Sequence, residues 1–236
     1  MFRIVFHKVF IIHDKLCRQG LFYFNVYGTG TISIIYEDYY KYDKYQKGDL
    51  RMYTGNYECL ELFVKSDEGK KGSVLLKNVK ESTTETKELK HIYGNWIKFP
   101  VSRNTEYEIS TQDCTITFAY LSECENIMEN GICVLDTTDN YKEMNKEEFL
   151  RFIDTPYREQ YHFSPVVNWN NDPNGLCWFK GYYHLFYQLN PFGQEWNNMY
   201  WGHAASKDLM HWTHLPVALE PQEEILDNLA IKGGAF

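Results

Sequence analysis

Residues 169–175, Trp-Asn-Asn-Asp-Pro-Asn-Gly, place one carboxylate in a segment whose backbone is restricted. Pro173 confines Asp172 to an extended backbone, and the tripeptide that begins with this proline supplies the residues of a tight turn. Gln188 and Trp196 follow in an aromatic-rich stretch. A carboxylate among amide and aromatic side chains suits a sugar site. Taken alone, however, such a segment is also typical of an ordinary turn.

Turn residues and aromatic strand candidates alternate after Pro156. The pair Lys180-Gly181 separates two of these candidates and is typical of a two-residue hairpin turn. We predict four antiparallel strands, at residues 176–179, 182–189, 199–205 and 212–219. Four strands in about 45 residues is the size of one propeller blade.

The region from about residue 161 to residue 221 closely resembles the first blade of glycoside hydrolase family 32, which contains the invertases, levanases and inulinases. The resemblance rests on three stretches: WNNDPNG at 169–175, YHLFYQLNPFG at 183–193 and EWNNMYWGHAASKDLMHW at 195–212. It implies a five-bladed β-propeller with its active site at the axial end of the central channel.

The resemblance also implies roles for single residues. Asp172 would be the nucleophile that attacks the anomeric carbon of a β-fructofuranoside, Asn171 and Gln188 would bind fructose hydroxyls, and Trp196 would form a wall of the sugar pocket. A retaining glycosidase also needs a second carboxyl group, about 5 Å away, to protonate the leaving oxygen. From the residues alone, Gln188 could instead pair with backbone at a strand end. Trp196 could instead be a packing residue.

The chain departs from the family pattern in two places. Asn170 stands where relatives usually have an apolar residue, and Ile-Lys-Gly-Gly at 231–234 stands where they have Phe-Ser-Gly-Ser. The first difference could alter packing beside the nucleophile. The second would replace a substrate contact with Lys232.

The family's Arg-Asp-Pro motif and the Glu-Cys motif that carries its acid/base do not follow the first blade in this sequence. Two Glu-Cys dipeptides, at 58–59 and 123–124, precede Asp172, against the family's order, and we interpret them as coincidence. We therefore expect a fragment of a longer enzyme, with an incomplete propeller and little or no activity of its own.

The region before the motifs has short β-rich runs separated by turn residues. We predict a β-rich, sandwich-like domain at residues 1–144, which could be accessory, a helical linker at 145–156 and the start of the propeller at 157–236. Asn145 is suited to cap the linker helix. The tyrosine-rich tract at 36–45 could be a platform on which sugars stack or an ordinary solvated strand edge or loop.

Composition limits the other classes of partner. Aromatic residues make up 17% of the chain, which favours a mainly β protein, and the net charge of -8 without a basic run argues against nucleic acid. The six cysteines lack a C-x-x-C pair, so we expect reduced thiols. No histidine pair has metal-ligand spacing, and we predict no metal and no cofactor. The apolar run at 9–12 is too short for a signal or membrane segment, so we expect a cytoplasmic protein without a membrane partner.

We therefore expect a mainly β protein in which a sandwich-like N-terminal domain is followed by the first blade or blades of a truncated five-bladed β-propeller. The expected function is hydrolysis of β-fructofuranosidic bonds in sucrose, levan or inulin by a retaining double displacement. The alternatives are a non-catalytic carbohydrate-binding fragment and a propeller glycosidase that acts on another furanoside. The sequence leaves open the particular fructoside, exo or endo action and the oligomeric state.

Overall fold

The structure, a computed structural model, describes residues 23–26, 32–35, 50–67, 70–91, 94–137, 142–154, 158–159 and 161–221. The chain forms two compact units, residues 1–46 and 47–236. In the first unit the described residues are two antiparallel strands, β1 (Tyr23–Val26) and β2 (Ile32–Ile35). The sequence features at 9–12, 36–45 and 231–234 lie outside the described residues.

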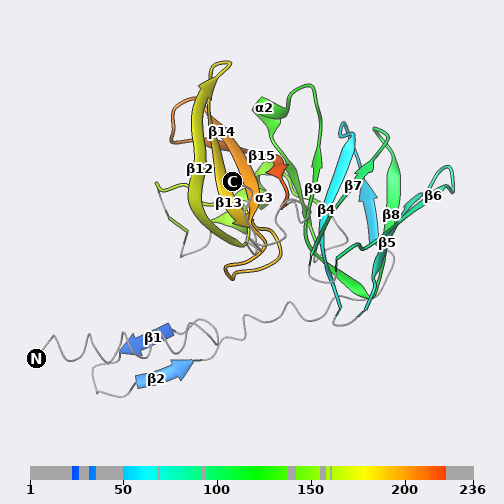
Figure 1. Ribbon diagram of the computed structural model, residues 1–236, viewed down its shortest axis with the longest axis horizontal. Coiled ribbons are helices and arrows are strands. Elements are labelled where there is room, and N and C mark those ends of the chain that lie inside the picture. The colour runs from blue at the N-terminus through cyan, green and yellow to red at the C-terminus, as the bar shows by residue number, and fades with distance from the viewer. Residues whose placement is uncertain are drawn as a thin grey trace, which may run out of the picture. The chain divides into compact units, whose positions relative to one another are not determined.

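Two antiparallel sheets of the second unit form a sandwich (Figure 1). One sheet has the order β3 (Leu50–Tyr53), β8 (Glu106–Gln112), β5 (Ser73–Asn78), β6 (Thr84–Glu88). The other has the order β11 (Lys142–Glu143), β10 (Cys133–Asp136), β9 (Cys114–Ser122), β4 (Cys59–Ser66), β7 (Asn95–Pro100). Strand β5 alternates, because Val74 and Leu76 are buried in the core between the sheets while Leu75, which lies between them, is half-buried.

A third antiparallel sheet, which we call the blade, follows the sandwich in the chain. Its strands lie in the order β12 (Trp169–Phe179), β13 (Tyr182–Asn190), β14 (Tyr200–Ser206), β15 (Trp212–Leu219). The hairpin at Lys180 and Gly181 is confirmed, with φ angles of 47° and 84° that fit a type I′ turn. All four predicted strands are present, although β12 begins at Trp169 rather than at Leu176.

Two short helices complete the described part of the second unit: α2 (Ile127–Asn130) and α3 (Lys146–Ile153). The helix expected after Asn145 is confirmed, and its start is fixed by a capping box between Asn145 and Glu148. Among the described residues, no helix is long and apolar enough to cross a membrane. The domain boundaries at 144 and 156 stay predictions.

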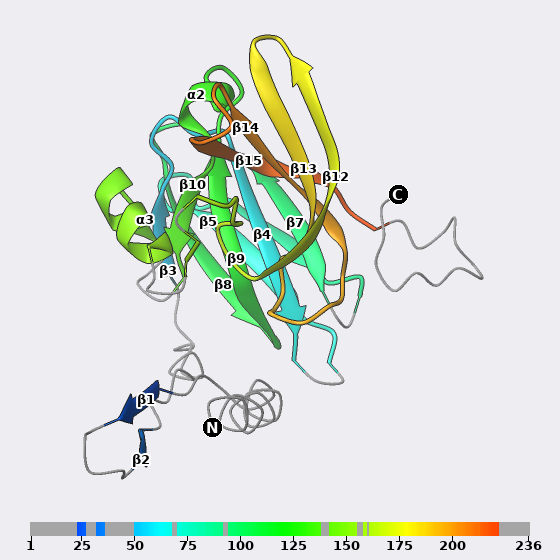
Figure 2. The ribbon, with the colours of Figure 1, turned by 90° about the vertical axis from the view of Figure 1, so that its left-hand side faces the viewer.

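The blade packs on the sandwich through a second apolar cluster (Figure 2). Phe63 of β4 lies at its centre, with its ring centroid 5.7 Å from that of Phe118, 5.9 Å from that of Phe192 and 5.9 Å from that of Tyr200. The sandwich also reaches the outer edge of the blade, because the Ile132 amide donates to the carbonyl of His214 in β15 over 2.9 Å. The sandwich thus covers one face and one edge of the blade.

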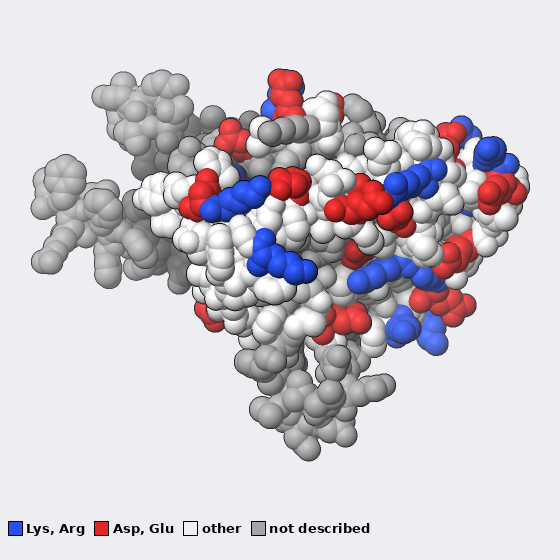
Figure 3. Space-filling view, turned by 90° about the horizontal axis from the view of Figure 1, so that it is seen from above, with Lys and Arg blue, Asp and Glu red and all other residues white. Residues whose placement is uncertain are grey.

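The predicted fold class is confirmed: the chain is mainly β, with a sandwich followed by a blade-like sheet, and the described sheets do not close on themselves. Acidic and basic side chains are interspersed over the face that Figure 3 shows. The absence of a nucleic-acid partner stays a prediction.

Candidate active site

Asp172 lies in an irregular stretch of β12, the edge strand of the blade. The pairing register with β13 shifts between Asn170 and Pro173. As a result Asn171 and Asp172 together lie opposite one residue of β13, Gln188. This two-against-one arrangement is a β-bulge, a feature that redirects side chains and is frequent next to active sites.

A second register shift follows directly, between Pro173 and Gly175. The expected tight turn at Pro173 is therefore wrong, because the chain continues as a strand through two bulges. A type II turn with Pro173 as its second residue would require a positive φ at Asn174, and Asn174 is not among the described residues with positive φ. A proline is tolerated here because an edge strand or bulge does not need its missing N–H donor.

The bulge is open to solvent. Asn171 and Asp172 are exposed and Gln188 is half-buried. A carboxylate that attacks a sugar must be reachable, and the bulge meets this requirement. Asn174 lies within the second shift, and its buried Nδ2 has no hydrogen-bond partner among the described residues.

Trp196 lies in the loop between β13 and β14, residues 191–199, which we call the Trp196 loop. The Trp196 side chain is 60% exposed. The loop begins directly after β13, and the Trp169 amide at the start of β12 donates to the Gly193 carbonyl over 3.1 Å. This bond ties the loop to the end of the blade that also carries the bulge.

Two histidines of the blade, His184 and His203, contact each other and an aromatic ring. Nδ1 of His184 lies 3.0 Å from Nε2 of His203, and the Phe186 ring stacks on that of His203 with centroids 4.3 Å apart. Burial and the neighbouring His184 lower the pKa of His203 to about 4. His203 is therefore neutral at neutral pH, and its contacts fit a packing role.

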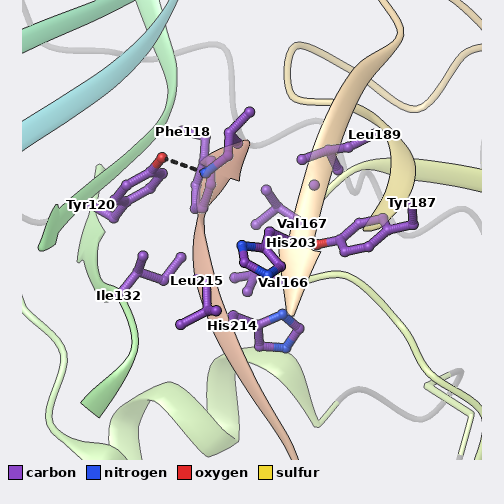
Figure 4. A pocket seen from close by; sticks show the side chains of 12 residues that line it. Phe118, Tyr120, Ile132, Val166, Val167, Tyr187, Leu189, His203, His214 and Leu215 are labelled. Carbon is purple, nitrogen blue, oxygen red and sulfur yellow. Dashed lines mark hydrogen bonds between the residues drawn. The ribbon is translucent and has the colours of Figure 1, made fainter. Parts of the chain in front are cut away.

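A small cavity lies between the sandwich and the blade (Figure 4). Its volume of about 10 Å³ suits about one water molecule and excludes a furanose ring. His214 lines it with an Nδ1 that has no partner in the described part of the chain, and burial lowers the pKa of this side chain to about 4. The cavity is therefore a feature of the interface and not the sugar site.

Within the described residues, no group of three or more His, Cys, Asp or Glu side chains could hold a metal ion. The absence of a metal or cofactor stays a prediction. The two Glu-Cys dipeptides lie in the sandwich, where Glu58 pairs with Arg103 at 3.0 Å and Glu123 accepts from Asn130 Nδ2 at 2.6 Å. These contacts give both glutamates a structural explanation.

Comparison with known proteins agrees with the blade geometry. Residues 162–236 match the family model "Glycosyl hydrolases family 32 N-terminal domain". The levanase of Bacillus subtilis is 59% identical over 73 residues, which are 31% of this chain and 11% of the levanase. The extracellular exo-inulinase of Aspergillus niger is 65% identical over 66 residues, which are 28% of this chain and 12% of the inulinase. The matched region thus spans about a tenth of the length of these curated relatives.

A solved family 32 glycoside hydrolase from Bifidobacterium adolescentis extends the likeness beyond the blade. It matches with a TM-score of 0.66 and 35% identity over 75% of this chain and 28% of its own. Residues 162–236 are 75 of 236 residues, about a third of the chain, so the structural match must include much of the sandwich. Residues 162–236 of this chain are therefore similar to the N-terminal domain of glycoside hydrolase family 32.

Proposed function

We propose that the protein hydrolyses β-fructofuranosidic bonds in sucrose, levan or inulin, with Asp172 as the nucleophile. The bulge carries the proposal, since it sets Asn171 and the exposed carboxylate of Asp172 together against Gln188. The family match of residues 162–236 and the names of the relatives, a levanase and an exo-inulinase, support the substrate class.

The proposed reaction is a double displacement. The Asp172 carboxylate attacks the anomeric carbon while the glycosidic C–O bond breaks, and the leaving oxygen takes a proton from a second carboxyl group. Water then attacks the fructosyl ester, gives its proton to that second group and releases fructose and the free carboxylate. The family's Glu-Cys motif does not occur after Asp172, so the second carboxyl group is proposed to come from outside these 236 residues.

The other three residues would bind the sugar. The amides of Asn171 and Gln188 can donate and accept hydrogen bonds, as adjacent fructose hydroxyls require. The exposed indole of Trp196 would provide an apolar wall for the furanose ring. Fixed polar groups with one aromatic wall are a usual composition for a small-molecule site.

Replacement of the nucleophile tests the proposal. In protein expressed from the complete gene, Asp172→Asn should lower kcat on sucrose, inulin or levan by at least about three orders of magnitude, because the amide cannot form the ester. Asp154→Asn is the matched control, because Asp154 is an exposed aspartate outside the blade. Near-normal turnover by Asp172→Asn would remove this residue from the mechanism.

Measurements of binding and of substrate preference separate the proposal from two alternatives. Fructoside binding by the wild-type protein without hydrolysis, measured by calorimetry, would favour a carbohydrate-binding protein. The observation behind that alternative is the missing Glu-Cys motif after Asp172. Cleavage of an arabinofuranoside in preference to a fructoside would favour a propeller glycosidase of different specificity.

A further inference from the structure

The Trp196 loop is anchored in the sandwich by an aromatic side chain. Phe192 is 7% exposed, and its ring centroid lies 5.9 Å from that of Phe63 in β4 and 5.6 Å from that of Tyr200 in β14. The sandwich backbone at Gly94 lies directly against the same ring, because a Cβ atom there would be 2.6 Å from Phe192 Cε2. The side chain of Phe192 is thus enclosed by residues of both the sandwich and the blade.

A hydroxyl of the sandwich also reaches the loop. Thr117 Oγ1 in β9 lies 3.1 Å from the carbonyl oxygen of Pro191 and 3.0 Å from that of Phe63. The Pro191 carbonyl accepts a further hydrogen bond from Asn168 Nδ2 over 2.8 Å. The first residue of the loop is therefore held from the sandwich side and from the segment that precedes β12.

Hydrogen bonds inside the loop connect these anchors to Trp196. The Phe192 amide donates to Asn190 Oδ1 over 3.0 Å, and Asn190 Nδ2 donates to the carbonyl oxygen of Glu195 over 2.8 Å. Asn190 is 3% exposed, and its bond with the Phe192 amide is buried. A displacement of Phe192 would be passed through Asn190 to the residue that precedes Trp196.

We propose that the β-sandwich contributes to the fructoside site, because it sets the position of the Trp196 loop. Thr117 and Phe192 are positioning residues that act through the loop and do not touch the sugar. The inference rests on the proposed function, in which Trp196 is a wall of the sugar pocket. It also predicts that the sandwich does not move as an independent module, since its contacts with the loop are buried.

The test replaces Thr117 by valine, which keeps the shape and removes the hydroxyl. In protein expressed from the complete gene, Thr117→Val should speed amide hydrogen exchange in residues 192–198 by about fivefold, the effect of one lost hydrogen bond. It should raise KM for the fructoside by a similar factor of about five and leave kcat within about twofold. Thr117→Ser should restore both values because it keeps the hydroxyl.

A matched control separates positioning from general destabilisation. Thr54 is a sandwich threonine that is fully buried, whereas Thr117 is half-buried. The Thr54 hydroxyl lies 2.7 Å from the carbonyl oxygen of Ser102 and 3.1 Å from that of Thr105, so its bonds join residues of the sandwich alone. Thr54→Val should lower the melting temperature without changing loop exchange or KM. Equal effects of Thr54→Val and Thr117→Val on the loop would overturn the proposal.

A second variant acts from the sandwich side alone. Gly94→Ala should push the Phe192 ring outward and speed exchange in the loop, whereas Gly72→Ala, whose Cβ would meet Cys114 Cβ at 2.7 Å, should not. Unchanged exchange in both Gly94→Ala and Thr117→Val would refute the coupling. If the wild-type protein cleaved no fructoside, the proposed function would fail, while the exchange data would still decide whether the sandwich positions the loop.

Discussion

The sandwich and the blade bury their apolar residues in different ways. The sandwich has a core of its own between two sheets, where Leu62, Val74 and Ile109 are at most 1% exposed. The blade is a single sheet that buries one face against the sandwich and leaves Trp178 and Phe179 of its edge strand 58% and 57% exposed. A sheet without a second layer cannot form a core alone. The blade therefore depends on the sandwich more than the sandwich depends on the blade.

The interface between the two regions also contains a polar network. Glu61 Oε2 accepts from Trp96 Nε1 at 2.7 Å and from Tyr120 Oη at 2.9 Å. Tyr120 Oη in turn accepts from the Val217 amide of the blade at 3.1 Å, the bond that is dashed in Figure 4. Directional bonds inside an apolar contact fix one arrangement of the two surfaces. The blade is thus held in register as well as buried.

Because the blade depends on the sandwich, we expect the largest loss of stability when a buried residue of their interface is replaced. Phe63→Ala should lower the free energy of unfolding by about 3–5 kcal/mol, because a fully buried aromatic ring leaves a cavity. Hydrogen exchange should show the loss mainly in β13, β14 and β15, while β5 and β8 stay protected. Ile109→Ala in the sandwich core should instead reduce protection from hydrogen exchange in both the sandwich and the blade. If protection fell in the sandwich alone, the stability of the blade would not depend on the sandwich.

The buried histidine of the interface predicts an acid-sensitive contact. Because burial lowers the pKa of His214 to about 4 from 6.5, the unfolded state binds a proton before the folded state does. The shift corresponds to about 3 kcal/mol in the free energy of unfolding. This amount is present above pH 6.5 and is lost as the pH falls from 6.5 to about 4. His214→Phe should flatten this part of the stability curve in urea titrations. Phe163→Leu, which alters packing beside His214 without removing a titrating group, should lower the whole curve and keep its slope.

Glu61 predicts a smaller dependence of the opposite sign. Desolvation raises the pKa of this carboxyl above 4.5, and Lys98, with its Nζ at 3.8 Å, only partly offsets the effect. A raised pKa in the folded state means that stability is greatest below pH 4.5 and declines as the pH rises through the folded value. Glu61→Gln should remove this decline and gain about 1 kcal/mol relative to wild type at pH 7. If Glu61→Gln instead lowered the free energy of unfolding, and did so more at pH 7 than at pH 4.5, the upward direction of the Glu61 pKa shift would be contradicted.

The exposed tie between α2 and the blade should matter least. Glu129 pairs with Lys207 Nζ at 3.0 Å and also accepts from the Tyr182 hydroxyl, with all of these groups at the surface. Lys207→Gln should lower the melting temperature only slightly, because water and salt screen exposed ion pairs. Thermal unfolding at low and high salt measures the effect. A loss of stability that is the same at high salt would contradict the interpretation of this contact as an ordinary screened ion pair.

The sequence predicted the blade better than the sandwich because the signals of the blade are local. Lys180-Gly181 specifies its own turn, and aromatic runs flank it. In the sandwich, β4 was not predicted, since Leu60 to Val64 are buried on both faces and show no alternation. Glu61 inside that run further obscured a core strand.

Prediction of the site was limited in the same way, because its geometry depends on contacts that local sequence signals do not specify. The resemblance provided Asn171, Asp172, Gln188 and Trp196, and the register now places the first three at one bulge. The bulge itself could not be predicted, because Pro-Asn-Gly is as typical of a turn as of an interrupted edge strand. The contact between Thr117 and Pro191 joins residues 74 positions apart, and no local pattern encodes such a pairing.

Trapping of the covalent intermediate tests the central claim most directly, namely that the bulge presents Asp172 to the anomeric carbon. Protein expressed from the complete gene would be mixed briefly with a β-fructosyl fluoride, quenched in acid, digested and analysed by peptide mass spectrometry. The result we predict is one fructosyl unit esterified to Asp172, absent from Asp172→Asn. A fructosyl unit on any other residue, or full turnover by Asp172→Asn, would contradict the claim.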